Sequence, residues 1–439
     1  MNRSSSSPHA SAHSIMSSVF ISKVAQSNST PTQSSRIVAR SRSEEPLPIA
    51  PFHSARSSTV DVRRRRSQGE SNTCERKSLS WVMIVGMSIE NNVSYRSRIR
   101  NAWAGRISGC MLGKPIEHMS MRKGREVLRT YLANAGALPL RDYVPLTQGF
   151  EADIEHHAAC REQIQRAIPD DDINYTLISL LILEEYGRGF ATADVGRAWL
   201  RYLPGAMVFT AEREAYARLL ADAGMRFPFG APPAFDIEEC SDNPYNDWIG
   251  AQIRADLYGW VNPGEPAEAA ALAQTDAALT HRGEGIHGAV VIAVAGSLIA
   301  AGTTLPEAME EAATYIPSGS DCAAAVSLGL ACVGDAEPSR LHAEFDGMSP
   351  VHTVNNLSLV TWGLARHPHD FSAAIGDTVS AGWDTDCNGA TVGGLWGLTG
   401  RTIPDEWVNS WNGVIETSLS GYAVVTLEEL VDRTLTVAN

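Results

Sequence analysis

The 439-residue sequence has few cysteines, little sign of β-strands and no clear secretory signal. Its seven cysteines include no Cys-x-x-Cys pair, which argues against a disulfide framework or a zinc site and favours a reducing compartment. Alternation of apolar and polar residues, the pattern of half-buried strands, is scarce. No apolar segment near the N-terminus has the form of a secretory h-region. We therefore expect a cytoplasmic, mostly helical protein.

Positive charge is scarce outside the first hundred residues. Residues 1–100 hold 15 of the 36 basic residues and 6 of the 50 acidic ones, which leaves 21 basic and 44 acidic residues for the remainder. Binding to nucleic acid needs clustered positive charge, so we expect no nucleic-acid partner. A phosphorylated ligand remains compatible with this acidic body if a metal ion or backbone amides meet its phosphates.

The basic residues of the N-terminal part lie in a low-complexity segment. It contains the serine run Ser4–Ser7 and the arginine run Arg63–Arg66, and no acidic residue precedes Glu44. Residues 1–93 are therefore predicted to be a disordered extension. Such composition is also typical of organellar transit peptides. An overlong gene model with the true start at Met83 or Met87, and a functional basic arm, are the other interpretations.

Residues 94–439 are predicted to form one large all-α domain. Two segments carry small residues at helical spacing, one from Ala102 to Gly113 and one from Gly389 to Gly397, and each would let another helix backbone approach closely. The apolar run Val290–Ala301 is expected to be a buried core helix rather than a membrane span. Residues 226–247, rich in Pro, Asp and Asn, are expected to form a long loop.

Two acidic clusters stand at predicted helix starts. Asp170–Asp172 follows Ile168-Pro169 and should begin a helix that runs to Tyr186 and ends at Gly187. Asp384 and Asp386 precede the glycine-rich segment. Each cluster alone could be an ordinary helix cap, but three adjacent carboxylates repel one another unless a cation lies among them. Together the clusters offer five carboxylates, the ligands that one or two Mg²⁺ ions prefer.

Four blocks in this order resemble the ADP-ribosylglycohydrolase family, over roughly residues 98–400. They are Gly109–Glu117, Asp170–Asp172, Thr280-His281 and Gly382–Asp386. The resemblance implies an all-α fold with a site for two Mg²⁺ or Mn²⁺ ions. It also implies a hydrolase that cuts the bond between the ribose of ADP-ribose and an acceptor, so the expected partner is an ADP-ribosylated protein or a small ADP-ribose conjugate, with no membrane partner.

The resemblance also assigns metal ligands. Asp171, Asp172, Asp384 and Asp386 match the ligands of the family. Asp170 stands where the family usually has Thr, and it could still bind a metal through its carboxylate. Cys387 stands where a Thr hydroxyl is often a ligand. Because a thiol is a poor partner for Mg²⁺, this position favours Mn²⁺.

The remaining roles concern the substrate. Glu117, expected in a loop after the first helix, matches a glutamate beside the metals and is the predicted catalytic residue. His281 matches a histidine on the ligand side, and Gly250 and Ala251 correspond to a loop near the distal ribose. Two alternatives stay open at this stage. One is a non-catalytic, crystallin-like binder of ADP-ribose, and the other is a hydrolase of a different ribosyl or phosphoryl substrate.

Overall fold

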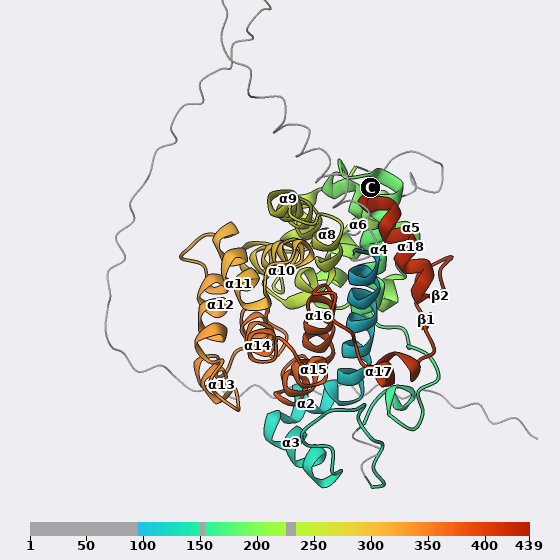
Figure 1. Cartoon of the computed structure of the whole chain (residues 1–439). Helices are drawn as coiled ribbons and strands as arrows, with labels where there is room; N and C mark the ends of the chain where they lie inside the picture. The colour runs from blue at the N-terminus through green and yellow to red at the C-terminus, as the bar shows by residue number, and fades with distance from the viewer. Residues whose placement is uncertain (1–94, 150–153, 225–233) are drawn as a thin grey trace, which may run out of the picture. The chain divides into compact units, whose positions relative to one another are not determined.

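The computed structural model describes residues 95–149, 154–224 and 234–439. Within these ranges the chain is helical apart from its connections and one pair of short strands (Figure 1). The prediction of a large all-α domain is confirmed. The predicted extension over residues 1–93 lies outside the described residues.

The helical elements begin with a helix that covers residues 95–113. The others, with η marking 3₁₀ turns, are η1 (Lys114–Ile116), α2 (Glu117–Lys123), α3 (Arg125–Asn134), η2 (His157–Ala159), α4 (Asp171–Tyr186), α5 (Thr192–Tyr202), η3 (Gly205–Met207), α6 (Thr210–Ala223), α7 (Ile237–Ser241), η5 (Ile249–Arg254), α8 (Asp256–Trp260), α9 (Pro266–Ala277), α10 (Gly283–Ala301), α11 (Leu305–Ala312), η6 (Ala313–Tyr315), α12 (Asp321–Ala331), α13 (Ser339–Glu344), α14 (Thr353–Arg366), α15 (Phe371–Ser380), α16 (Thr385–Gly397), α17 (Asp405–Asn409) and α18 (Leu427–Ala438).

Two of these elements differ from the sequence prediction. Glu117 is not in a loop, because η1 leads directly into α2 and Glu117 is the first residue of that helix. The expected loop over residues 226–247 contains the short helix α7, which Asp236 caps by accepting a hydrogen bond from the Glu239 amide at 3.1 Å. Residues 225–233 are outside the described part.

The two small-residue faces pack directly against each other. A Cβ atom at Gly105 would overlap with the carbonyl oxygen of Gly393, and one at Gly109 would overlap with that of Gly389. The contacts pair early residues of one helix with late residues of the other, so residues 95–113 and α16 run antiparallel (Figure 1). Only glycine permits this approach, which brings η1 and the start of α16 to the same end of the helix pair.

Helix α10 forms part of the hydrophobic core. It is the one helix in the described residues that is long and apolar enough to cross a membrane, and 78% of its most apolar window is buried inside the protein. Helices α8 and α9 pack against it. The burial agrees with the expectation of a core helix.

The short strands fix the segment in front of α4. β1 (Val414–Glu416) pairs antiparallel with β2 (Val424–Thr426), with Ile415 opposite Val425. The Ala167 amide donates to the Val414 carbonyl and the Glu416 amide donates to the Ala167 carbonyl, both at 2.9 Å. The C-terminal part of the chain therefore holds the approach to Asp170.

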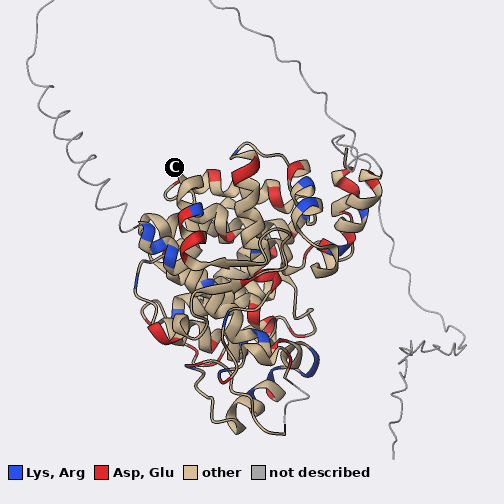
Figure 2. Ribbon diagram, turned by 90° about the vertical axis from the view of Figure 1, so that its right-hand side faces the viewer, with Lys and Arg blue, Asp and Glu red and all other residues tan. Residues whose placement is uncertain are grey.

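Charged side chains are distributed over the whole domain. In Figure 2 the Lys and Arg residues of the described ranges are scattered among the acidic ones. This arrangement agrees with the acidic composition of the domain.

Candidate metal centre

Carboxylates from three helix starts converge at one place. Three groups of side chains bring their ligand atoms within 4.8 Å of one another. They are Cys110 with Asp170 and Asp172, Asp172 with Asp386 and Cys387, and Glu117 with Asp384 and Asp386. We call the set of Glu117, Asp170, Asp171, Asp172, Asp384 and Asp386 the acidic cage. The structure therefore joins two clusters that lie more than 200 residues apart in the sequence.

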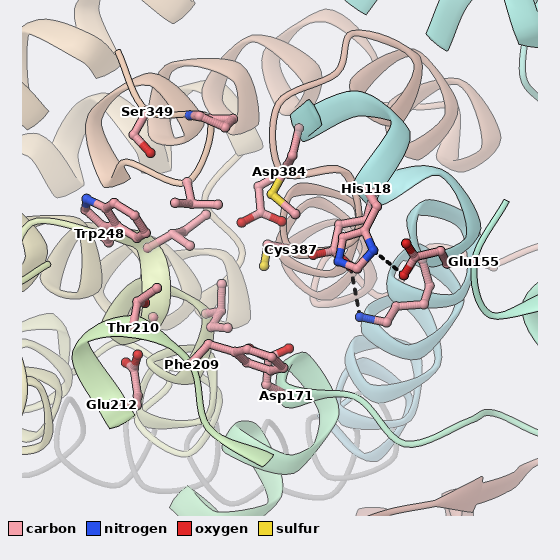
Figure 3. Close-up of a pocket in the computed structure, with 18 of the residues that line it drawn as sticks. His118, Glu155, Asp171, Phe209, Thr210, Glu212, Trp248, Ser349, Asp384 and Cys387 are labelled. Carbon is pink, nitrogen blue, oxygen red and sulfur yellow. Dashed lines mark hydrogen bonds and ion pairs between the residues drawn. The ribbon is translucent and has the colours of Figure 1, made fainter. Parts of the chain in front are cut away.

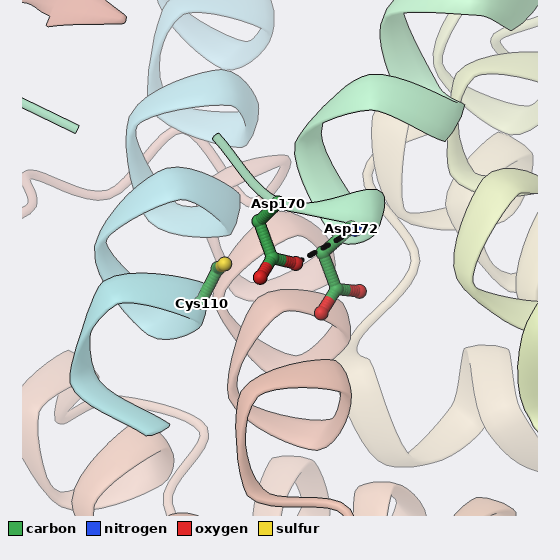
Figure 4. Close-up of side chains that lie close together, drawn as sticks. All are labelled: Cys110, Asp170 and Asp172. Carbon is green, nitrogen blue, oxygen red and sulfur yellow. Dashed lines mark hydrogen bonds between the residues drawn. The ribbon is translucent and has the colours of Figure 1, made fainter. Parts of the chain in front are cut away.

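Asp170 serves as the cap of α4. Its Oδ1 atom accepts a hydrogen bond from the Asp172 amide at 2.9 Å, and Figure 4 shows Asp170 and Asp172 facing Cys110. An N-terminal carboxylate of this kind stabilises a helix, because it satisfies a free amide and faces the positive end of the helix dipole.

A buried arginine, Arg106, fixes the position of Asp172. Arg106 donates from Nε to the Asp172 carbonyl at 2.8 Å and from Nη2 to Asp172 Oδ1 at 3.1 Å. Its Nη1 atom donates to Asp256 Oδ2 at 2.9 Å, and all three side chains are fully buried. The arginine fixes one oxygen of Asp172 and leaves Oδ2 without a hydrogen-bond partner.

Asp384 is held in a different way. The chain before it is left-handed at Gly382 (φ 94°) and Trp383 (φ 57°), and Ser120 Oγ donates to the Trp383 carbonyl at 2.7 Å. A non-glycine residue at positive φ is strained, and such strain is concentrated at functional sites. The Asp384 side chain makes no capping bond to α16, and its buried Oδ1 atom has no hydrogen-bond partner. Asp384 is therefore not an ordinary helix cap.

A lysine lies inside the cage. Lys114 Nζ is 2.6 Å from Asp170 Oδ2 and 3.0 Å from both Glu117 Oε2 and Asp386 Oδ2. Sequence reasoning missed this residue. Its place three residues before Glu117, inside the Gly109–Glu117 block, was the available signal, since residues three apart can meet on one helical face.

The pKa values of the cage carboxylates are shifted in different directions. Burial raises the pKa of Asp171, Asp172 and Asp384 well above its ordinary value, and neighbouring carboxylates add to the rise. Burial and Asp386 raise the pKa of Glu117 in the same way. Burial acts against ionisation of Asp170 too, but the Lys114 ammonium outweighs it and lowers the pKa of Asp170. Without a further cation, the cage is therefore electrostatically strained.

The donor set fits a divalent cation. Two buried carboxylate oxygens, Asp172 Oδ2 and Asp384 Oδ1, lack hydrogen-bond partners, and buried acceptors left in this state are costly. Oxygen-rich ligand sets suit Mg²⁺ or Mn²⁺. The exception is the thiol of Cys387, whose pKa is raised by burial and by Asp172. A softer ion than Mg²⁺ accommodates such a ligand better.

The acidic cage lies at a pocket of about 640 Å³. This volume is within the range of small-molecule binding sites. Asp171, Asp384 and Cys387 line it together with Lys114 and Glu117, and Figure 3 shows Trp248 on the opposite side of the pocket from His118 and Glu155.

Sequence reasoning missed several further lining residues, of which three have aromatic or fully buried acidic side chains. They are Phe209, with 51% of its surface exposed, Trp248 and the buried carboxylate Glu212. Glu212 accepts a hydrogen bond at 3.0 Å from Arg254, which itself is buried. Of these three, only Trp248 had a signal in the sequence, because it lies two residues before the predicted Gly250. Phe209 and Glu212 lie at the start of α6, far from every motif.

The predicted substrate residues separate into two groups. Gly250 and Cys387 line the pocket, and Ala251 is the buried neighbour of Gly250 on η5. His281 is fully buried and does not line the pocket. Its Nδ1 atom is 2.5 Å from Thr280 Oγ1 and 3.8 Å from Glu212 Oε1, so it lies behind the pocket wall that Glu212 forms.

Fold and site together define an all-α protein whose pocket ends in a cage of buried carboxylates suited to a cation. The chain belongs to the ADP-ribosylglycohydrolase family, whose model matches residues 91–438. It is also similar to a solved structure described as an "ADP-ribosylglycohydrolase-related protein complex", with 19% identity over 79% of this chain and 98% of that chain and a TM-score of 0.51. No curated protein sequence matches it. The family match supports glycosidic hydrolase activity.

Proposed function

We propose that this protein is a divalent-metal-dependent glycohydrolase that releases ADP-ribose from a protein side chain or a small conjugate. The observation that supports this most strongly is the convergence of five carboxylates at the starts of α2, α4 and α16, beside a pocket of about 640 Å³ that Glu117, Asp171 and Asp384 line. Family membership supplies the reaction class.

Asp171, Asp172, Asp384 and Asp386 would hold Mg²⁺ or Mn²⁺. When bound, such an ion supplies Lewis-acid chemistry and orients ribose hydroxyls or a water molecule. Asp170 contributes less directly, because Oδ1 caps α4 and Oδ2 is paired with Lys114. In this arrangement its charge supports the cage rather than the ion.

Glu117 is the residue that we assign to the reactive ribose carbon. It lines the pocket beside Asp384, and its Oε2 atom is 3.0 Å from Lys114 Nζ. The lysine holds this carboxylate at the edge of the cage, where it can exchange a proton with water or with the departing acceptor. Carboxylates act in this way on oxocarbenium-like sugar transition states.

Two aromatic residues of the pocket suit a nucleotide base. Phe209 and Trp248 present aromatic surface to the pocket, and an aromatic face can stack on a base. Trp248 is held by an edge-to-face contact with Tyr245, with ring centroids 4.7 Å apart. A base on these residues and a ribose at the cage would span the pocket.

The test is the release of ADP-ribose from ADP-ribosylated protein, measured by chromatography with Mg²⁺ or Mn²⁺ present. The wild-type chain should release it, a chelator should stop the reaction, and Asp384→Asn should lose most of it. Asp405→Asn, at an exposed first-turn aspartate of α17, is the matched control and should keep full activity. Equal turnover in Asp384→Asn and the wild type would rule out the metal assignment.

One rival function has a distinct outcome in the same experiment. Titration calorimetry that detects ADP-ribose binding, combined with no hydrolysis of any conjugate, would identify a non-catalytic binder. If the protein hydrolysed other ribosyl or phosphoryl compounds but no ADP-ribose conjugate, the proposed substrate class would be wrong and the metal assignment would be unaffected.

A further inference from the structure

Lys114 is placed where a cation belongs. Its ammonium is within 3.0 Å of one carboxylate oxygen from each of three separate helix starts, those of Glu117, Asp170 and Asp386. The ammonium donates hydrogen bonds to Glu117 and Asp386 and forms an ion pair with Asp170, so three carboxylates share its charge. Only 11% of its side chain is exposed. The lysine is therefore built into the cage and is not a surface residue that happens to reach it.

The other buried cation of the region has a different position. Arg106 contacts Asp172 and Asp256, and it does not line the pocket. Lys114 lines the pocket and lies between the carboxylates. Like charges at short range repel strongly in a buried site, and the ions of a two-metal centre are about 4 Å apart. A divalent ion on the Glu117 side would have to displace the ammonium.

We propose that Lys114 takes one of the two cation positions of the acidic cage, so that the site binds a single divalent ion. The proposal rests on the proposed function only in treating the cage as the metal site of a glycohydrolase. It goes beyond that function because it states the number of metal ions. One cation position is filled by the Lys114 ammonium and the other by a single divalent ion.

The remaining position for the divalent ion follows from the lysine contacts. The first of the three candidate groups consists of Glu117, Asp384 and Asp386. Two of these residues, Glu117 and Asp386, form ion pairs with Lys114. The group of Cys110, Asp170 and Asp172 has no member that lines the pocket. The group of Asp172, Asp386 and Cys387 shares only Asp386 with the lysine, and Cys387 lines the pocket.

Unpartnered oxygen atoms support this position. Asp172 Oδ2 belongs to the group and has no hydrogen-bond partner, and Asp384 Oδ1, one residue before α16, has none either. Both residues are more than nine-tenths buried. Lys114 contacts neither of them, so its ammonium leaves these acceptors unsatisfied. A single ion on this side would complete the cage.

The experiment counts metal ions in the full chain. The protein is freed of metal with a chelator and titrated with MnCl2 by calorimetry, and the bound Mn²⁺ is examined by electron paramagnetic resonance. We expect one Mn²⁺ per chain and the six-line spectrum of an isolated ion. Lys114→Met keeps a long side chain without charge and should bind two Mn²⁺ ions with a spectrum broadened by coupling. Lys114→Arg keeps the charge and should bind one.

Arg122→Met is the matched control. It removes one positive charge from nearby α2, at a side chain that is 71% exposed, and should bind one ion like the wild type. Two coupled ions in the wild type, or one ion in Lys114→Met, would overturn the proposal. If Lys114→Met does not fold, the wild type and Lys114→Arg still decide, because two ions in either would contradict it. Ion counts need no substrate, so failure to release ADP-ribose would count against the proposed function and not against this stoichiometry.

Discussion

The two acidic segments of the cage, Asp170–Asp172 and Asp384–Asp386, look alike in sequence, but different interactions fix their carboxylates. Asp170 caps α4 through its Oδ1 atom, and its cluster is neutralised by Lys114 and Arg106. Asp384 stands at the same position relative to α16 but makes no capping bond, and the left-handed Trp383 sets its direction. One segment is stabilised by its own contacts. Each segment keeps one buried carboxylate oxygen without a partner, Asp172 Oδ2 and Asp384 Oδ1, but only Asp384 lacks a capping bond to its helix, which suits a residue that serves chiefly as a ligand.

The largest expected effect on stability comes from removing Arg106, which pairs with Asp172 of the first segment. Arg106→Met should lower the free energy of unfolding by about 3–5 kcal/mol, because it leaves the buried Asp172 and Asp256 without their countercharge. Urea denaturation of the metal-free protein measures it. Arg340→Met, at an arginine that is 58% exposed, should change the same quantity by less than about 0.5 kcal/mol. A loss below about 1 kcal/mol for Arg106→Met would show that the first segment does not depend on this pairing.

The second segment should respond in the opposite way. Asp384→Asn should weaken Mn²⁺ binding by at least about 100-fold, since changes even outside the ligand shell cost about 10–100-fold. Its stability without metal should be unchanged or higher, because the substitution removes a buried carboxylate that has no capping bond to α16 and whose Oδ1 atom has no hydrogen-bond partner. Calorimetric titration and urea denaturation give both values. An equally large loss of stability would mean that Asp384 has a structural role like that of Asp172.

The start of the second segment also depends on the glycine contact between α16 and residues 95–113. Gly389→Ala should cost about 1–3 kcal/mol, because its Cβ would meet the Gly109 carbonyl and lie 2.9 Å from Val379 Cγ2. Gly319→Ala, where nothing lies within 4 Å of a Cβ, is the control. Thermal unfolding compares the two. A neutral Gly389→Ala would indicate that the helices separate without cost.

Local patterns in the sequence predicted much of this arrangement. The cap at Asp170, the end of α4 at Gly187 and the two small-residue faces are consequences of spacing and of backbone chemistry that neighbouring residues determine. The sequence predicted a close helix contact at each face, and the structure shows that the two faces contact each other. Of the site residues carried over from the family, Glu117 and the acidic residues lie together, whereas His281 lies apart from the pocket.

Other features depend on tertiary contacts that no local pattern encodes. In the sequence Lys114 is only a polar residue after a helix, and its role follows from its contacts with residues of α4 and α16. Arg106 is buried because it pairs with Asp172 and Asp256, which lie in distant segments of the chain. Phe209 and Glu212 reach the pocket through the path of α6. His281 follows a motif at the right place in the chain, yet packing sets it behind Glu212.

The pH dependence of stability also distinguishes the two segments. The pKa of Asp170 is lowered below 3.8 in the folded protein, so its ionised form stabilises the fold above about pH 4, and this contribution is lost as the pH falls through the lowered value. The pKa of Asp384 is raised above 3.8, so the folded state binds its proton more tightly than the unfolded state does. Stability of the metal-free protein should therefore decline as the pH rises above about 4, by up to about 1.4 kcal/mol per pH unit for each such group.

Two conservative substitutions measure these opposite contributions. Asp170→Asn keeps a capping side chain but loses the charge that pairs with Lys114, so the metal-free variant should be less stable than the wild type at pH 7. Asp384→Asn should be at least as stable at pH 7 and should show a flatter decline between pH 4 and pH 7. Urea denaturation across this range provides the curves, and Asp405→Asn should follow the wild type. If both cage variants shifted the curve in the same direction, the two segments would share one electrostatic role, and the contrast between a self-supported cap and an ion-dependent ligand would be wrong.

Saturating Mn²⁺ sharpens the test, because a bound ion favours ionised carboxylates. It should remove the decline of stability with pH from the wild type while leaving it in Asp384→Asn.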